Sequence, residues 1–161
     1  MSIARFGHVS ETIYRENAAA FQDAMKVEEI PLPVRATAGS AGYDFFAPYE
    51  LVLEPGEAVT VPTGFRVRMV PGWVLQIFPR SGLGFKFKLQ LANTVGIIDS
   101  DYYHARNEGH IMIKLFNDGR EGGIVRIAKG EAFAQGVFTE YGITFDDGAD
   151  GIRTGGFGST T

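Results

Sequence analysis

The stretch VGIIDSDY, residues 95–102, joins a short apolar run to two carboxylates and a tyrosine. Residues 95–98 are β-branched apart from one glycine, which is typical of a buried strand. On an extended backbone, Asp99 and Asp101 would project to the same side, two residues apart. A second apolar run follows at 110–116, so we predict a hairpin whose mouth carries the acids. On this stretch alone, the two aspartates could equally cap backbone amides in a turn.

Composition narrows the class of protein. The chain has 161 residues, of which 45% are hydrophobic, and this suits one domain with a real core. A net charge of −4 argues against a general nucleic-acid binder or a membrane-surface protein. The absence of cysteine excludes a disulfide framework, a thiolate zinc site and a thiol nucleophile. Residues 1–9 lack a long apolar segment and no run approaches membrane-spanning length, so we expect a cytoplasmic protein with one domain over residues 1–161.

Residues 10–27 are expected to form the one sizeable helix. Ser10 is a suitable N-cap, and prolines at positions 31 and 33 prevent the helix from continuing. One apolar stripe recurs at helical spacing: Tyr14, Ala18, Phe21 and Met25. We expect this stripe to pack on the body of the fold or on a neighbouring subunit, without a chemical role.

From residue 32 onward the pattern is one of short strands and turns. Turn signals such as Pro55-Gly56 and Asp118-Gly119 separate apolar segments at regular spacing, which favours an all-β sandwich or barrel. The expected strands are Tyr43–Ala47, Leu51–Leu53, Ala58–Pro62, Phe65–Met69, Trp73–Phe78, Leu89–Asn93, Gly96–Ile98, His110–Phe116, Ala132–Tyr141 and part of 124–128. Residues 146–161 are rich in Gly, Asp, Ser and Thr and are expected to form a mobile C-terminal arm.

Basic residues and glycines follow the strand expected at 73–78. Arg80 offers a planar fork of donors, Ser81 a hydroxyl, and Gly82 lets the backbone approach an anion closely. Such a combination can cradle phosphates as a backbone nest does. The alternative for this segment is a tight turn with a surface salt bridge.

Three further features stay open when each is taken alone. Asp44 follows a glycine turn, where an aspartate is usually a turn residue. Gln135 stands in an apolar run, either as a satisfied core amide or as a ligand contact. Phe157 lies among glycines with no core of its own, so its segment is either a disordered tail or an arm that closes over a ligand. Polar residues of that tail could meet phosphate oxygens: Arg153, Ser159 and Thr160.

Taken together, five segments resemble the motifs of the trimeric deoxyuridine triphosphatase (dUTPase) family in order and spacing. They are AGYDFFAP (41–48), PRSGLGFK (79–86), NTVGIIDSDY (93–102), KGEAFAQ (129–135) and RTGGFGST (153–160). The resemblance implies an all-β, jelly-roll-like β-barrel, here with one N-terminal helix. It also implies hydrolysis of dUTP to dUMP and pyrophosphate with Mg²⁺, which keeps uracil out of DNA and supplies dUMP. The family works as a homotrimer with shared active sites.

The resemblance also implies roles for single residues. Asp99 matches the catalytic aspartate that orients the attacking water. Tyr102 matches the tyrosine that packs under the deoxyribose and leaves no room for a 2′-hydroxyl, and Asn93 matches the asparagine that reads the uracil edge. Ile97, Ile98 and Met112 match residues that line the same pocket.

The remaining roles concern the phosphates, the metal and the arm. Asp44 matches the aspartate associated with the metal through water. The matches to the phosphate-binding groups are Arg80, Ser81, Gly82 and Gln135. The matches to the closing arm are Arg153, Phe157, Ser159 and Thr160, with Phe157 over the base.

The chain departs from the family pattern at several points. Ala132-Phe133 stands where many members have an arginine and an isoleucine, and residues 103–109 form a longer loop than usual. A protein partner could dock on this loop and on the added helix, so a dUTP-gated regulatory protein is one alternative to an enzyme. A dCTP deaminase of the same fold is another, which the IDSDY run and the glycine-rich arm disfavour.

Overall fold

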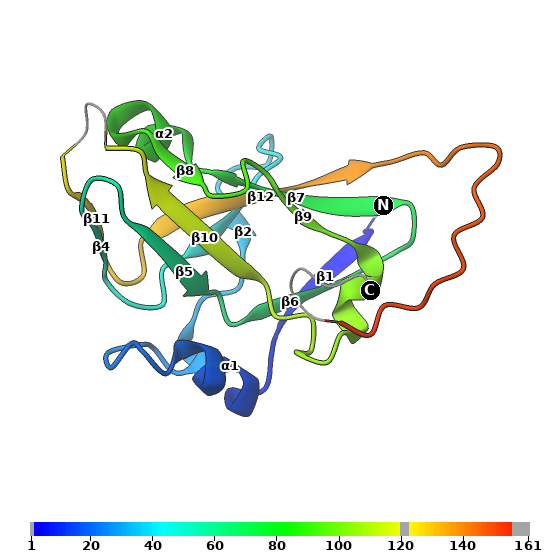
Figure 1. Cartoon of the computed structure of the whole chain (residues 1–161), viewed down its shortest axis with the longest axis horizontal. Helices are drawn as coiled ribbons and strands as arrows, with labels where there is room; N and C mark the ends of the chain where they lie inside the picture. Colours follow the sequence, from blue (N-terminus) through cyan, green and yellow to red (C-terminus); the bar gives the residue numbers. More distant parts are fainter. Residues whose placement is uncertain (1, 120–122, 156–161) are drawn as a thin grey trace.

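The computed structural model describes residues 2–119 and 123–155. Within these residues the chain forms mostly short strands, with few and short helices (Figure 1). The elements are β1 (Ala4–His8), α1 (Glu11–Ala18), the 3₁₀ turn η1 (Val27–Glu29), β2 (Val34–Arg35), β3 (Tyr43–Phe46), β4 (Leu51–Leu53), β5 (Ala58–Pro62), β6 (Phe65–Met69), β7 (Trp73–Pro79), α2 (Ser81–Phe87), β8 (Leu89–Leu91), β9 (Gly96–Ile98), the 3₁₀ helix η2 (Ser100–His104), β10 (Met112–Asn117), β11 (Val125–Ile127) and β12 (Ala132–Glu140).

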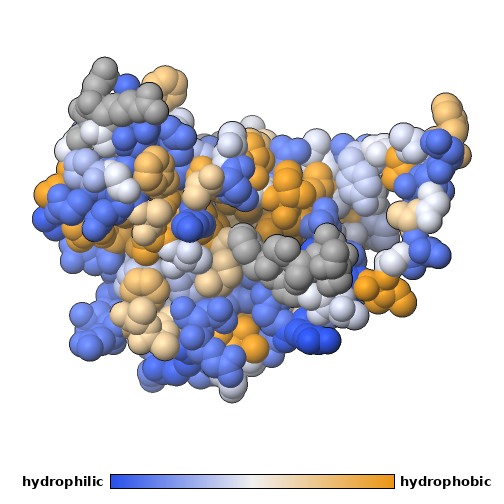
Figure 2. All heavy atoms as spheres, viewed as in Figure 1, coloured by the Kyte–Doolittle hydropathy of each residue, from blue (hydrophilic) through white to orange (hydrophobic). Residues whose placement is uncertain are grey.

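The strands of this region form antiparallel sheets around a common interior. The largest sheet has the order β2-β3-β12-β7-β9, and a second has the order β5-β10-β8. Two-stranded sheets, β1-β6 and β4-β11, complete the arrangement. The face shown in Figure 2 is largely polar, with apolar atoms gathered near its middle. The fold is the expected jelly-roll-like β fold.

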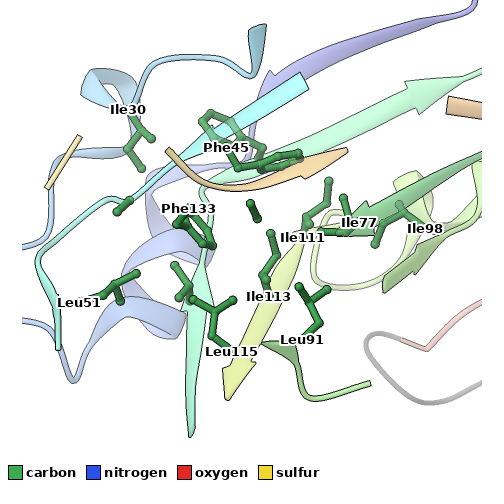
Figure 3. Close-up of a cluster of buried hydrophobic side chains, with 14 of the residues drawn as sticks. Ile30, Phe45, Leu51, Ile77, Leu91, Ile98, Ile111, Ile113, Leu115 and Phe133 are labelled. Atoms are coloured by element: carbon green, nitrogen blue, oxygen red, sulfur yellow. The ribbon is translucent and has the colours of Figure 1, made fainter. Parts of the chain in front are cut away.

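The core lies between the two larger sheets. Ile113 and Leu115 of β10 are buried while Lys114 between them is exposed, which is the period of a strand with one face inward. Figure 3 shows these two side chains beside Phe133 of β12, which is fully buried. Ile77, Leu91 and Ile98 lie together at one end of the same cluster (Figure 3), where they come close to the surface pocket described below.

Most predicted strands are confirmed, but the predicted hairpin is wrong. β9 pairs with β7, with Leu75 opposite Ile98, whereas β10 pairs with β5 and β8. The two strands that flank the acids therefore lie in different sheets. Residues 99–111 bridge the sheets instead of forming a turn, and η2 occupies part of this bridge. Consequently Asp101 lies in a 3₁₀ helix and not on an extended strand.

The N-terminal helix is shorter than the predicted range of 10–27. Ser10 caps α1 as expected, with its hydroxyl accepting a hydrogen bond from the Ile13 N–H, but the helix ends at Ala18. Beyond it, the Phe21 ring stacks on Tyr49 at a centroid distance of 3.8 Å. No strong helix breaker lies between residues 19 and 26, so the early end of the helix goes with this tertiary contact and not with a local sequence signal. The predicted apolar stripe does pack on the body of the fold.

Other elements were not expected. β1 adds to the edge of β6, and the short β2 adds to β3. The segment predicted as a phosphate-cradling turn is the helix α2, which is capped at its C-terminus by Lys88 in a left-handed conformation with φ of 53°. In the part of the chain that the structure describes, no helix is long and apolar enough to cross a membrane.

A buried histidine connects the bridge to the body of the fold. His110 is fully buried, and its Nε2 accepts a hydrogen bond of 2.9 Å from the Gly64 N–H. Nε2 must therefore be unprotonated. Burial lowers the pKa of the His110 imidazole to about 4, and the nearby Glu108 carboxylate opposes this shift only in part.

This histidine predicts an acid-sensitive fold. The unfolded chain protonates His110 near pH 6.5, whereas the folded chain resists protonation down to about pH 4. The contribution of neutral His110 to the free energy of unfolding is roughly 3 kcal/mol. This contribution is fully present above pH 6.5 and is lost as the pH falls toward 4. His110→Gln keeps an acceptor for the Gly64 N–H without titrating, so its melting temperature should depend less on pH between 6.5 and 5. Identical slopes in parent and variant would contradict this account.

Candidate active site

A pocket of about 410 Å³ opens between the two larger sheets. Its walls come from β9 and η2 on one side and from β8 and β10 on the other, so it occupies the gap that the separation of β9 from β10 creates. The lining residues are Ile77, Leu91, Ala92, Asn93, Val95, Gly96, Ile97, Ile98, Asp99, Tyr102, Met112, Ile113, Lys114 and Arg153. The apolar area in the middle of the face in Figure 2 lies over this region of the fold.

A glycine fixes the depth of the pocket at β9. A Cβ on Gly96 would lie 3.0 Å from the Cβ of Ile77 on the paired strand. Only a glycine lets β9 approach β7 this closely without a shift, and its missing side chain leaves room above Ile77 and Leu91. The pocket therefore has an apolar floor, and its polar groups stand at the rim.

Tyr102 forms a fixed wall. Only 4% of the residue is exposed, and its hydroxyl donates a hydrogen bond of 2.8 Å to the His110 carbonyl. The Asn107 amide Nδ2 donates to the same hydroxyl at 2.8 Å. Burial raises the pKa of the Tyr102 hydroxyl, so it stays protonated and keeps its donor role at neutral pH.

Two acids and one arginine form the charged end of the pocket. Arg153 Nη2 lies 2.6 Å from Asp99 Oδ2, and Arg153 Nε lies 2.9 Å from Asp101 Oδ1. The C-terminal segment makes this contact possible, because it leaves β12, swings away from the body and returns beside η2 (Figure 1). The acids thus meet one guanidinium, although they do not share one face of a strand as predicted.

A second polar group forms on a different set of strands. Gln135 of β12 lies opposite Asp44 of β3 and opposite Phe78 of β7 in the sheet register. Arg80 follows β7, and its Nε lies 3.4 Å from Asp44 Oδ1. The Gln135 amide donates to the Pro79 carbonyl at 3.4 Å. Three of the predicted site residues are therefore gathered here, outside the lining of the pocket.

Gly42 and α2 border this second group. A Cβ on Gly42 would lie 2.4 Å from Gln135 Oε1, so the glycine leaves space for the amide. Ser81 and Gly82 form the first turn of α2, where N–H groups have no partner within the helix and can meet an anion. With Arg80 as the N-cap residue, this end of the sheet carries one guanidinium and a set of backbone donors.

The side chains of this region offer little to a metal by themselves. Groups of three or more His, Cys, Asp or Glu able to hold an ion are absent from residues 2–119 and 123–155. Asp44 is a single carboxylate, and its side chain is 16% exposed. This arrangement fits Mg²⁺, because that ion keeps several waters and commonly takes its other ligands from substrate phosphates.

The predicted site residues thus fall into three sets. Those that line the pocket are Asn93, Ile97, Ile98, Asp99, Tyr102, Met112 and Arg153. Those that lie apart from its lining, around the end of β7, are Asp44, Arg80, Ser81, Gly82 and Gln135. Phe157, Ser159 and Thr160 lie outside the described residues.

Sequence reasoning did not identify several contributors to the site. Ile77 and Leu91 form the floor and Lys114 lines the wall, but in the sequence they are ordinary strand residues. Asn107 carried no signal either, because its spacing from Tyr102 matches no motif. A partner for Tyr102 could have been expected only from the general rule that buried tyrosine hydroxyls find one.

Comparisons with known proteins show which family this chain resembles. A family model described as dUTPase matches residues 28–161. The deoxyuridine 5′-triphosphate nucleotidohydrolase of Hahella chejuensis (strain KCTC 2396) is 42% identical over 142 residues, covering 82% of this chain and 88% of that protein. The protein of the same name from Lactococcus lactis subsp. lactis (strain IL1403) is 43% identical over 136 residues, with coverages of 81% and 88%. The crystal structure of a dUTPase from Streptococcus mutans superposes with a TM-score of 0.67 at 35% identity, covering 89% of this chain and 98% of that one.

Proposed function

This chain belongs to the dUTPase family and is a dUTP diphosphatase, and we propose that Asp99 activates the water that attacks the α-phosphate of dUTP. The observation that carries the proposal is the pocket, which brings a carboxylate, a buried tyrosine and an amide together. A carboxylate within hydrogen-bond reach of a water can orient it and accept its proton. The products are dUMP and pyrophosphate.

The base and sugar would occupy the apolar part of the pocket. The Asn93 amide offers one donor and one acceptor to the uracil edge, and a cytosine would leave polar groups mispaired at a cost of a few kcal/mol. The fixed ring of Tyr102 would pack under the deoxyribose and exclude a 2′-hydroxyl. Backbone groups of Ile98 and Met112 and the side chain of Ile97 would line the same space.

Arg153 is the arginine that the pocket itself offers to the phosphates, and the other suitable groups lie elsewhere in the chain. Arg80, the first-turn amides of α2 and Gln135 are suited to phosphate oxygens, but they lie outside the pocket lining. We therefore infer a homotrimer in which the phosphate-binding group of one subunit faces the pocket of another. Phe157, Ser159 and Thr160 would complete the site from the C-terminal arm.

Arg153 would change partners during the reaction. In this structure it is paired with Asp99, and a carboxylate whose oxygen accepts a 2.6 Å hydrogen bond from a guanidinium is a weaker base toward a water. A triphosphate offers Arg153 more negative charge than the two acids do, so binding would draw the guanidinium away and free Asp99. Binding of the phosphates would thereby free Asp99 to act on the attacking water.

Magnesium would be held mainly by the phosphates and by waters, with Asp44 accepting hydrogen bonds from those waters. Bound there, the ion would neutralise charge on the phosphate chain. Because Asp44 also pairs with Arg80, both groups would face the same part of the substrate.

Asp99→Asn should fold and bind dUTP but lose most of its turnover. Removal of a general base typically costs roughly 10²–10⁴-fold in rate. Pyrophosphate release at saturating dUTP measures the loss, and binding of a non-hydrolysable dUTP analogue shows that the pocket is intact. Asp101→Asn is the matched control, since it removes the neighbouring charge and should retain far more activity. Turnover of Asp99→Asn within about threefold of the parent would exclude it as the base.

Tyr102→Ala should weaken the preference for dUTP over UTP. Loss of the ring opens the space that a 2′-hydroxyl would need, so the ratio of kcat/KM for the two nucleotides should fall by about tenfold or more. The ratio, measured for parent and variant, is the readout. If it does not change, sugar discrimination resides elsewhere in the site.

Mixing two inactive variants should restore activity if the site is shared. Arg80→Ala lacks the phosphate-binding arginine and Asp99→Asn lacks the base, but each keeps what the other has lost. In randomly mixed trimers about a quarter of the sites would join two intact halves, so about a quarter of the parent activity should return. The two proteins are unfolded and refolded together, and mass measurement verifies mixed trimers. A lack of recovery in verified mixed trimers would assign both residues to a site within one chain.

A further inference from the structure

The long loop 103–109 contacts the tyrosine of the pocket from behind. We propose that Asn107 is a positioning residue that holds Tyr102 against the sugar site, and that the N-terminal segment secures the loop for this task. The proposal rests on the function proposed above, because it takes Tyr102 as the residue that contacts the deoxyribose. It gives the loop a role within its own subunit, whereas docking of a protein partner there stays a prediction.

Asn107 uses both ends of its amide. Its Nδ2 donates to the Tyr102 hydroxyl at 2.8 Å, while its Oδ1 accepts a hydrogen bond of 3.2 Å from the Gly109 N–H. The Tyr102 hydroxyl in turn donates to the His110 carbonyl. The hydroxyl therefore has one donor and one acceptor in fixed directions, which together set the position of the ring. A hydroxyl with only one of these two partners could pivot about that single hydrogen bond, and the ring would move with it.

The backbone of the loop is shaped to bring the amide to this place. Glu108 and Gly109 adopt positive φ angles of 58° and 69°. A Cβ on Gly109 would lie 2.6 Å from the Tyr102 carbonyl oxygen, so only a glycine allows the loop to close against Tyr102. A non-glycine residue such as Glu108 adopts a left-handed conformation at some cost in energy, and the surroundings must hold it there.

Two contacts from distant parts of the chain hold the loop. The Ser10 N–H, at the start of α1, donates to Glu108 Oε2 at 2.7 Å. Arg66 of β6 donates through Nη2 to the Tyr103 carbonyl at 2.7 Å, and its guanidinium lies 3.7 Å from the centroid of the Tyr103 ring. The added N-terminal segment thus reaches the sugar site through Glu108 and the loop.

This arrangement would matter for selectivity more than for chemistry. A ring that excludes a 2′-hydroxyl by contact must stay in place when the larger sugar presses against it, since a small displacement admits the extra oxygen. Loss of the Asn107 amide should therefore raise KM for dUTP and improve relative use of UTP, with kcat changed less. A group that acted on the water or the phosphates would instead lower kcat.

A double-mutant cycle tests the proposal in the full-length enzyme. Asn107→Ala should lower the dUTP-to-UTP ratio of kcat/KM by about 3- to 10-fold, the usual effect of one lost hydrogen bond. Tyr102→Phe removes the hydroxyl that Asn107 holds, so adding Asn107→Ala to it should change the ratio no further. Equal effects of Asn107→Ala in both backgrounds would overturn the proposal, because they would show that the residue supports the loop in general.

Controls separate folding and the proposed function from this inference. Arg106→Ala alters an exposed side chain of the same loop and should leave the ratio unchanged. Should Asn107→Ala fail to fold, Glu108→Ala loosens the loop at its N-terminal contact and should lower the ratio in the same direction. A changed ratio in Tyr102→Ala with an unchanged one in Asn107→Ala refutes the positioning role alone. An unchanged ratio in Tyr102→Ala refutes the proposed function of that tyrosine, and the positioning role falls with it.

Discussion

The pairing of β9 with β7 is the constraint on which the site depends. Because Gly96 allows this close pairing, the backbone groups of β9 are satisfied within the larger sheet, and β10 pairs with β5 and β8 in the other. The chain must then cross from one sheet to the other directly after Ile98. The gap between the sheets becomes the pocket, and the crossing segment carries Asp99 and Tyr102 to its rim. Fold and site therefore have the same cause.

The charged groups at the rim of the pocket are held by weak contacts. Asp99 and Asp101 lie near enough to share Arg153, whose positive charge offsets the repulsion between them. The side chains of both acids remain about half exposed, so the pair contributes little to stability and can separate at small cost. A weak contact would suit the proposed release of Arg153 when the more highly charged triphosphate arrives. A deeply buried ion pair at this position would hold the base in an inactive state.

The sequence predicted the strands well because alternation of apolar residues is a local property, as in β10. It failed where distant contacts decide. Nothing near β9 indicates that its partner is β7, and the stacking of Phe21 on Tyr49 cannot be foreseen from a helical stripe. The catalytic candidates were found through motif order, but the pairing of Arg153 with Asp99 depends on the path of a segment 54 residues away. The role of Asn107 could not be predicted for the same reason, since its contact with Tyr102 depends on the conformation of the loop.

The site residues in the described part of the chain form two separate groups, and this separation bears on assembly. If the pocket takes the base and the sugar as proposed, phosphate-binding groups must face it, and within one chain Arg80 and Gln135 lie outside its lining. In the proposed homotrimer, a rotation that brings the phosphate-binding edge of one subunit to the pocket of the next would complete a site at every interface, and a closed ring would leave no edge unused. Such an interface is formed from two different surfaces. Selection for catalysis would then act on the interface itself. Any substitution that shifts one subunit relative to its neighbour would also shift the phosphate-binding groups relative to the pocket that holds the uracil and the sugar.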